Sequence, residues 1–315
     1  MTPSWQSRVA SCYARLVIRR RDWGTGRQIA QRAQRVFGMP APLSRVASWG
    51  LRVERVRAAD GIRGEWVVPA TPRRGVIMYI HGGGYLSCSA ESHRPVIGAL
   101  ARAANCRVFG VDYRLAPDTS FPGAFDDVLS TYRWLLERGA PEEPVVLAGD
   151  SAGGGLALAV AAHLRQTDLP QPACVVALSP WTDLALTGES LVGNDGRCAM
   201  FRTENMPAFA AVYLDGAAAD DPRVSPLYAD VRGLAPVLMQ VGTTELLRDD
   251  ARRMHERIVR AGGSSRLTEY EDVMHGWHLL WPVVPEASRA IAEAAAFIGA
   301  WLPSTGDDSS QRLGE

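Results

Sequence analysis

The chain of 315 residues contains no lysine, few cysteines and no excess of either charge. All 34 basic residues are therefore arginine, a bias that we attribute to the coding sequence, and 34 acidic residues balance them. A chain of zero net charge has no general attraction to nucleic acid. The five cysteines lack CxxC spacing, and their odd number argues against a complete disulfide framework. We expect no bound metal, because no metal-ligand pattern is present.

Long hydrophobic segments are also missing. No stretch approaches the roughly 20 apolar residues that a membrane-spanning helix requires. Arg8 and Arg15 interrupt the N-terminal region, which therefore lacks the apolar core of a signal peptide. We accordingly expect a cytoplasmic protein with reduced thiols. Its length, with 47% hydrophobic residues, suffices for one large core or for a core domain with an insertion.

Apolar strand patterns and helical patterns follow one another from residue 51 onward. The predicted strands lie at 51–56, 65–68, 75–80, 107–111, 145–148, 174–178, 237–241 and 266–270. The predicted helices among them lie at 123–138, 151–165, 249–260 and 286–302. Because most of these strands are apolar throughout, we expect a parallel sheet that helices cover on both faces.

Three segments depart from this alternation. Residues 183–225 are rich in Gly, Asn, Asp and Ala, contain a helical pattern at 206–214, and are predicted to form an insertion that covers a binding site. Residues 5–37 are predicted to form one or two helices with a break at 24–26. Their arginines indicate either the solvent-facing side of a peripheral helix or a helix on a membrane surface. The tail, residues 304–315, is expected to be disordered.

The strongest local motif is Gly149-x-Ser151-x-Gly153, between the strand at 145–148 and the helix at 151–165. This strand–turn–helix context is typical of a nucleophile elbow, in which small neighbours allow a tight turn and the serine hydroxyl is exposed. The helix N-terminus also supplies a positive field where negative charge develops. The other interpretation is a glycine-rich turn in which the serine caps the helix.

A second glycine-rich motif directly follows the strand at 75–80 and consists of His81, Gly82, Gly83 and Gly84. Three glycines allow close approach of the backbone and leave amide groups available. The amides of Gly83, Gly84 and Ala152 are suited to an oxyanion hole, in which one donor lowers the barrier by about 3–4 kcal/mol. A phosphate-binding loop would end in GK[ST], which is absent here. A plain glycine turn is the remaining alternative.

One of six histidines is expected to act as the general base. His275 follows the strand at 266–270 by a short loop, so it can lie at the edge of the sheet. His278 begins an apolar stretch and is predicted to be packed, and a metal site of these two histidines would need a third ligand that we do not find. The histidines in helical patterns are predicted to be solvated or to cap helices: His93, His163 and His255.

Five motifs occur in a fixed order: HGGG (81–84), YRLAP (113–117), GDSAGG (149–154), SPWTDL (179–184) and DVMHGW (272–277). With them the chain resembles the hormone-sensitive-lipase family of carboxylesterases over residues 45–302. The resemblance implies an α/β-hydrolase fold, with an eight-stranded, mostly parallel sheet flanked by helices and a helical cap. The expected division is a core of 46–182 and 226–303, and a cap of 1–45 and 183–225.

The same resemblance implies hydrolysis of short- to medium-chain acyl esters of small molecules, without a cofactor. It also makes the edge strand at 266–270 a candidate contact of a homodimer. Large side chains of the cap are expected around the acyl group: Trp5, Tyr13, Met200, Phe201, Phe209 and Tyr213.

The acid of the site is assigned by comparison with a family pattern. The family pattern G-x-x-D-x-L-x-D is similar to residues 242–249 here, where Glu245 stands in place of the usual first aspartate. Asp249 matches the second, usually non-catalytic, acid. Asp249 and Asp250 open the helix at 249–260 and are expected to cap its free amide groups. We therefore predict a triad of Ser151, His275 and Glu245, with Asp249 as the alternative acid.

Other readings of the same residues stay open. A deacetylase or amidase acting on a specialised metabolite would use the same triad, and a non-catalytic ligand receptor on this fold would typically have lost a triad member. Asp150 and Asp183 are interpreted as structural hydrogen-bonding groups. Arg114 is expected to pair with Asp126 or Asp127.

Overall fold

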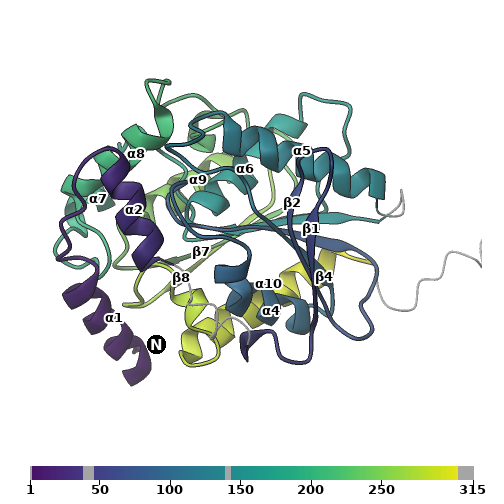
Figure 1. Ribbon diagram of the computed structural model, residues 1–315, viewed down its shortest axis with the longest axis horizontal. Coiled ribbons are helices and arrows are strands. Elements are labelled where there is room, and N and C mark those ends of the chain that lie inside the picture. The colour runs from purple at the N-terminus through teal and green to yellow at the C-terminus, as the bar shows by residue number, and fades with distance from the viewer. Residues whose placement is uncertain (1, 38–45, 139–142, 304–315) are drawn as a thin grey trace, which may run out of the picture.

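An eight-stranded sheet forms the centre of the computed structural model, which describes residues 2–37, 46–138 and 143–303 (Figure 1). The strand order is β1-β2-β4-β3-β5-β6-β7-β8. The strands are β1 (Arg52–Arg57), β2 (Arg63–Val68), β3 (Val76–Ile80), β4 (Arg107–Val111), β5 (Val145–Asp150), β6 (Val175–Leu178), β7 (Val237–Gly242) and β8 (Ser265–Tyr270). β2 runs antiparallel to β1 and β4, and the other pairs are parallel. The predicted fold class is confirmed.

Helices and short 3-10 turns connect these strands. The helices are α1 (Trp5–Val17), α2 (Arg27–Val36), α4 (Arg94–Ala103), α5 (Gly123–Arg138), α6 (Ala152–Leu164), α7 (Ser190–Gly193), α8 (Met206–Leu214), α9 (Arg248–Arg260) and α10 (Pro285–Trp301). The 3-10 turns are η1 (Glu91–His93), η2 (Thr203–Asn205), η3 (Pro226–Tyr228) and η4 (Trp277–Leu280). None of the described helices combines the length and the apolarity needed to cross a membrane.

Helix α4 is absent from the sequence-based prediction, for a physical reason. Its ten residues include Pro95 and Gly98, which interrupt a helical pattern in the sequence. Its one buried charge, Arg94, donates two hydrogen bonds of 2.6 Å to Glu65 of β2. This ion pair fixes the start of α4 against the sheet.

The sheet lies between two helical layers (Figure 1). α4 and α10 cover one face, and α5, α6 and α9 cover the other. Alternate residues of β3 reach the two cores: Ile77 and Tyr79 pack in the layer with α4 and α10, whereas Met78 and Ile80 pack in the other layer. Both faces of this strand are therefore apolar, as expected for a buried parallel strand.

The parallel strands bring distant loops to one edge of the sheet. β5 ends at Asp150, β7 at Gly242 and β8 at Tyr270, so the loops that follow these strands lie side by side. Helices α1 and α2 lie next to α7 and α8, at one end of the molecule (Figure 1). The predicted disorder of 304–315 falls outside the described residues.

Candidate active site

Ser151 occupies a strained turn between β5 and α6. Its backbone has φ +53° and ψ −121°, a region that non-glycine residues rarely adopt. The turn is tight because its neighbours are small: a Cβ on Gly153 would lie 2.0 Å from the carbonyl oxygen of Ile80. The amide of Ser151 donates to the carbonyl oxygen of Leu178 at 2.8 Å. This is the geometry of a nucleophile elbow.

His275 connects this serine to an acid. Its Nε2 lies 2.9 Å from Ser151 Oγ, and its Nδ1 lies 2.5 Å from Glu245 Oε2. All three side chains are buried. The three residues lie on the loops after β5, β7 and β8. These loops leave the same edge of the sheet, which brings the residues together.

The carboxylate of Glu245 is fixed by more than the histidine. Its Oε1 accepts hydrogen bonds from Ser179 Oγ at 2.8 Å and from the amide of Gly242 at 2.6 Å. Oε2 is thereby directed at His275. The sequence did not predict this role of Ser179, although the residue stands in the SPWTDL motif. The contact with Glu245 becomes apparent only once Ser179 is placed beside β7.

The two aspartates after Glu245 bind elsewhere. Both lie in the first turn of α9, as predicted, but the predicted capping of that helix is wrong. The N-cap residue is Leu247, which makes no side-chain cap. Instead, Asp249 Oδ2 accepts from the amide of Ser190 at 2.7 Å. Asp250 Oδ2 accepts from the amides of Thr182 and Asp183 at 2.8 and 2.9 Å, so these carboxylates hold the segment that follows β6.

The HGGG loop passes directly in front of Ser151. Gly83 and Gly84 line the same cavity as Ser151, and Ala152 begins α6 next to it. Gly83 has φ +111°, and a Cβ there would lie 2.3 Å from the carbonyl oxygen of Ser87. The loop therefore requires glycine at this position.

A buried hydrogen-bond network supports this loop from below. Asp150 Oδ1 accepts from the amide of Gly82 at 3.0 Å and from Tyr79 Oη at 2.8 Å. His93 Nε2 lies 3.4 Å from Asp150 Oδ2. Burial tends to raise the pKa of Asp150, but His93 and the hydrogen bonds outweigh it and lower the pKa to about 2.

His81 belongs to the same network. It stacks on Tyr113 with ring centroids 4.2 Å apart, and its Nδ1 lies 2.7 Å from the carbonyl oxygen of Gly82. Burial, followed by the nearby His93, lowers the pKa of His81 to about 4. Of the two predicted roles of His93, solvation is wrong, because the ring is buried; His93 does stand at the N-cap position of α4, but its side chain makes no capping hydrogen bond. Because α4, which follows His93, was not predicted, the sequence did not place this histidine beside Asp150.

Other predicted polar contacts can be placed. His278 is packed as predicted, with Nε2 at 3.2 Å from Gln240 Oε1, and burial lowers its pKa to about 3. Arg114 pairs with Asp127, which settles the choice between two aspartates. Within the described part of the chain, no three His, Cys, Asp or Glu side chains are grouped as metal ligands.

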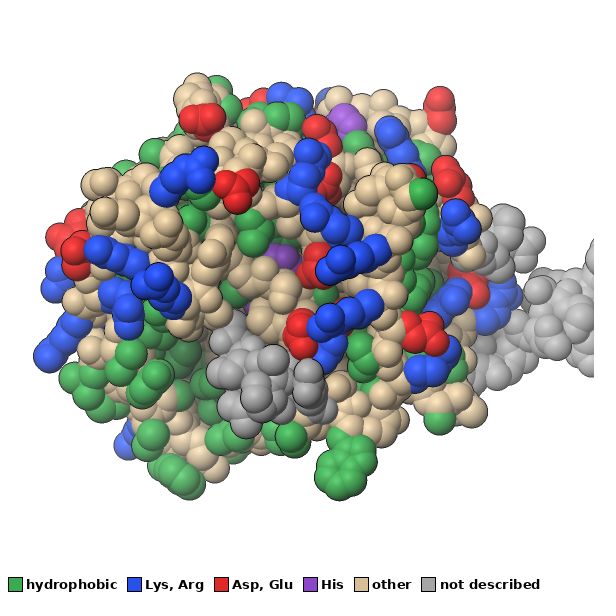
Figure 2. Space-filling model, viewed as in Figure 1, with side chains coloured by type: hydrophobic (Ala, Val, Ile, Leu, Met, Phe, Trp, Pro, Cys, Tyr) green, Lys and Arg blue, Asp and Glu red, His purple; other side chains and the backbone are tan. Residues whose placement is uncertain are grey.

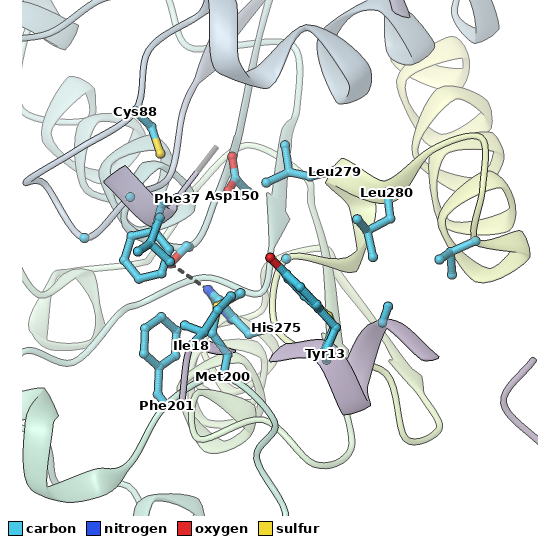
Figure 3. A pocket seen from close by; sticks show the side chains of 18 of the residues that line it. Tyr13, Ile18, Phe37, Cys88, Asp150, Met200, Phe201, His275, Leu279 and Leu280 are labelled. Carbon is cyan, nitrogen blue, oxygen red and sulfur yellow. Dashed lines mark hydrogen bonds between the residues drawn. The ribbon is translucent and has the colours of Figure 1, made fainter. Parts of the chain in front are cut away.

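A cavity of about 810 Å³ opens onto Ser151 and His275. Its walls are mainly apolar (Figure 3). Five of the six cap side chains expected around the acyl group line it: Trp5, Tyr13, Met200, Phe201 and Phe209. Tyr213 does not, because it is buried and stacked on Tyr85 at a centroid distance of 3.8 Å.

Known proteins share this fold and its sequence. A family model described as an alpha/beta hydrolase fold matches residues 77–279. A solved esterase of the bacterial hormone-sensitive lipase family superposes with a TM-score of 0.83 at 36% identity, over 96% of this chain and 100% of that one. The chain belongs to the hormone-sensitive-lipase family of α/β-hydrolases. The resemblance inferred from the five motifs is thus confirmed.

Two curated relatives of this hormone-sensitive-lipase-family chain have named activities. An acetyl-hydrolase of Streptomyces hygroscopicus is 42% identical over 234 residues, which are 74% of this chain and 78% of the relative. An esterase of Acinetobacter venetianus is 35% identical over 248 residues, which are 78% of this chain and 82% of the relative.

Proposed function

We propose that Ser151, His275 and Glu245 are the catalytic triad of this chain, which is a serine carboxylesterase. The observation that carries the proposal is the unbroken line of hydrogen bonds from Ser151 Oγ through the imidazole to Glu245. Such a line activates a serine hydroxyl, which is a weak nucleophile at neutral pH without an adjacent base.

In the first half of the reaction, Ser151 Oγ attacks the ester carbonyl while His275 Nε2 accepts the hydroxyl proton. The carbonyl oxygen becomes an oxyanion, which the amides of Gly83, Gly84 and Ala152 stabilise. Collapse of the tetrahedral intermediate breaks the bond to the alcohol oxygen, and the imidazolium gives that oxygen its proton.

In the second half, water replaces the alcohol. His275 takes a proton from the water as it attacks the acyl-enzyme, and then returns a proton to Ser151 Oγ as the carboxylic acid leaves. Glu245 presents one tautomer of the imidazole to the serine and stabilises the imidazolium. Because Ser179 and Gly242 hold the other carboxylate oxygen, the acid stays in this orientation throughout.

The substrates are esters of short to medium acyl chains. The apolar cavity supports this class, since it is large enough for an acyl group and an alcohol group at once. The name of the Streptomyces relative, an acetyl-hydrolase, points to the short end of the range.

The proposal also covers a helical cap made of the predicted segments 1–45 and 183–225, of which residues 1 and 38–45 lie outside the described part of the chain. Its support is that α1, α8 and the loop before η2 contribute side chains to the cavity wall.

A cytoplasmic location and a homodimer belong to the proposal as well. The position of β8 as an edge strand supports a dimer contact there.

An acyl-chain series of p-nitrophenyl esters tests the function. We expect the highest kcat/KM for short chains, no turnover by Ser151→Ala, and a covalent fluorophosphonate adduct on Ser151 in the wild type. A clear preference for acyl groups longer than about ten carbons would contradict the substrate class, and a missing adduct would refute the nucleophile. Matched O-acetyl and N-acetyl substrates separate an esterase from a deacetylase.

A further inference from the structure

Helix α1 presents its large apolar side chains outward. Its buried residues are Ser7 and Ala14, which are small. Its exposed residues include five large apolar ones, with exposed fractions of 38% to 71%: Trp5, Val9, Tyr13, Leu16 and Val17. A surface helix normally turns its apolar stripe to the core. Here the stripe has the helical spacing but the opposite orientation.

This stripe continues into the active-site cavity. Trp5, Val9 and Tyr13 line the cavity as well as the surface. Val283 also lines it and is 68% exposed. We call this set the entrance ridge: Trp5, Val9, Tyr13, Leu16, Val17 and Val283. Four of these side chains, Trp5, Val9, Tyr13 and Val283, place one part of the entrance ridge at the mouth of the site.

Positively charged side chains lie beside the entrance ridge. The first 21 residues contain no acidic residue and five arginines: Arg8, Arg15, Arg19, Arg20 and Arg21. Among the described residues, no carboxylate pairs with Arg8, Arg20 or Arg21. Figure 2 shows basic side chains directly beside the hydrophobic ones at the α1 end of the molecule.

Four arginines also surround a small hollow on the flank of α1. This cavity of about 260 Å³ is lined by Cys12, Leu16 and the four arginines 15, 19, 20 and 202. Asp195 and Glu204 offset the charges of Arg19 and Arg202. Within the described part of the chain, Arg15 donates to the carbonyl oxygens of Gly196 and Arg197 and pairs with no carboxylate, so no acidic partner offsets its charge there. Guanidinium groups in this arrangement are suited to phosphate oxygens.

We propose that α1 docks on an anionic lipid surface. The entrance ridge inserts at the boundary between headgroups and acyl chains, and the arginines contact lipid phosphates. Apolar side chains on one face with arginines beside them are the pattern of a helix that lies in a membrane interface. In this position the cavity faces the lipid, so that apolar esters can enter it without crossing water.

Sedimentation with vesicles tests the proposal, using the full chain. We expect binding to vesicles that contain phosphatidylglycerol, weaker binding as salt is added, and little binding to phosphatidylcholine alone. Arg8→Glu with Arg20→Glu, and separately Leu16→Asp, should each reduce binding at least tenfold. None of these three residues lines the active-site cavity, so kcat/KM for a soluble short-chain ester should not change.

Matched controls separate this surface from general effects of charge. Arg133→Glu with Arg138→Glu on α5, and Val259→Asp on α9, make the same changes at exposed sites away from α1. These variants should bind like the wild type. Equal loss in the control variants, absence of binding to anionic vesicles, or a dimer in which a second copy covers the ridge would overturn the proposal. Ser151→Ala should still bind lipid, so this result and the proposed hydrolysis can fail independently.

Discussion

Three carboxylates stand within six positions after β7, and the structure gives each a different partner. Glu245 reaches the imidazole, Asp249 holds Ser190, and Asp250 holds the amides that follow β6. The extra methylene of glutamate leaves the imidazole contact intact. The difference among them therefore lies in where the backbone places each side chain.

Glu245→Ala should lower kcat by roughly 10³- to 10⁴-fold, because the imidazole would lose the group that fixes its tautomer. Steady-state kinetics on a p-nitrophenyl ester measure this directly. Asp249→Ala is the matched control. It removes one hydrogen bond, worth about 1 kcal/mol, and should mainly lower the melting temperature. If Asp249→Ala lost more activity than Glu245→Ala, the assignment of the acid would be wrong.

At the residue scale the sequence identified the candidate site residues more readily than the residues that contact them. Ser151, Glu245 and His275 were predicted because each follows a predicted strand within a recognisable pattern. Ser179 and His93 were not, because their roles depend on which strands are neighbours. That order is set by crossover connections, and no local pattern of residues records it.

At the scale of elements, Asp250 joins α9 to the segment after β6. Burial, followed by the nearby charge of Asp183, raises the pKa of this carboxyl to about 8. An acid whose pKa is higher in the folded state than in the unfolded state, where it is about 3.9, favours folding while it is protonated. Stability from this group is therefore largest at low pH and declines as pH rises from about 4 towards 8.

Asp250→Asn tests this linkage. The amide keeps an oxygen that can accept from Thr182 and Asp183, but it cannot ionise. We expect the free energy of unfolding of the variant to fall less between pH 5 and pH 8 than that of the wild type, measured by urea denaturation. Parallel pH profiles for the two proteins would show that Asp250 ionises normally in the folded state.

The elements themselves were largely predictable. All eight strands were predicted near their observed positions, because apolar runs mark the central strands and alternation of polar and apolar residues marks the edge strand β1. α4 was missed because Pro95 and Gly98 interrupt the helical pattern within its ten residues. The short helix α7 lacks the length for any periodicity to be visible.

At the scale of the whole molecule, the start of the chain is tied to its last helix. The amide and the hydroxyl of Ser4 both donate to the carboxylate of Glu286 at 2.7 Å. Since Glu286 lies at the start of α10, this contact connects α1 to the hydrolase core. It sets the position of Trp5 and Tyr13, which line the cavity.

Glu286→Ala should loosen α1 without disturbing the contacts among Ser151, His275 and Glu245. We expect faster tryptic cleavage near the N-terminal arginines, a raised KM and a nearly unchanged kcat, because the cavity wall would be less well defined. Glu286→Gln retains an acceptor oxygen and should lie closer to the wild type. An unchanged cleavage rate in Glu286→Ala would mean that other contacts suffice to hold α1.

The left-handed backbone of Ser151 has a consequence for the protein as a whole. A non-glycine residue held in such a region costs about 1–3 kcal/mol, and the packing of β3 against α6 must maintain it at all times, with or without substrate. The proposed nucleophile is thus held in its strained geometry before any ester arrives, at the expense of the resting fold. Selection for a more stable protein and selection for a faster one therefore act in opposite directions at this one position.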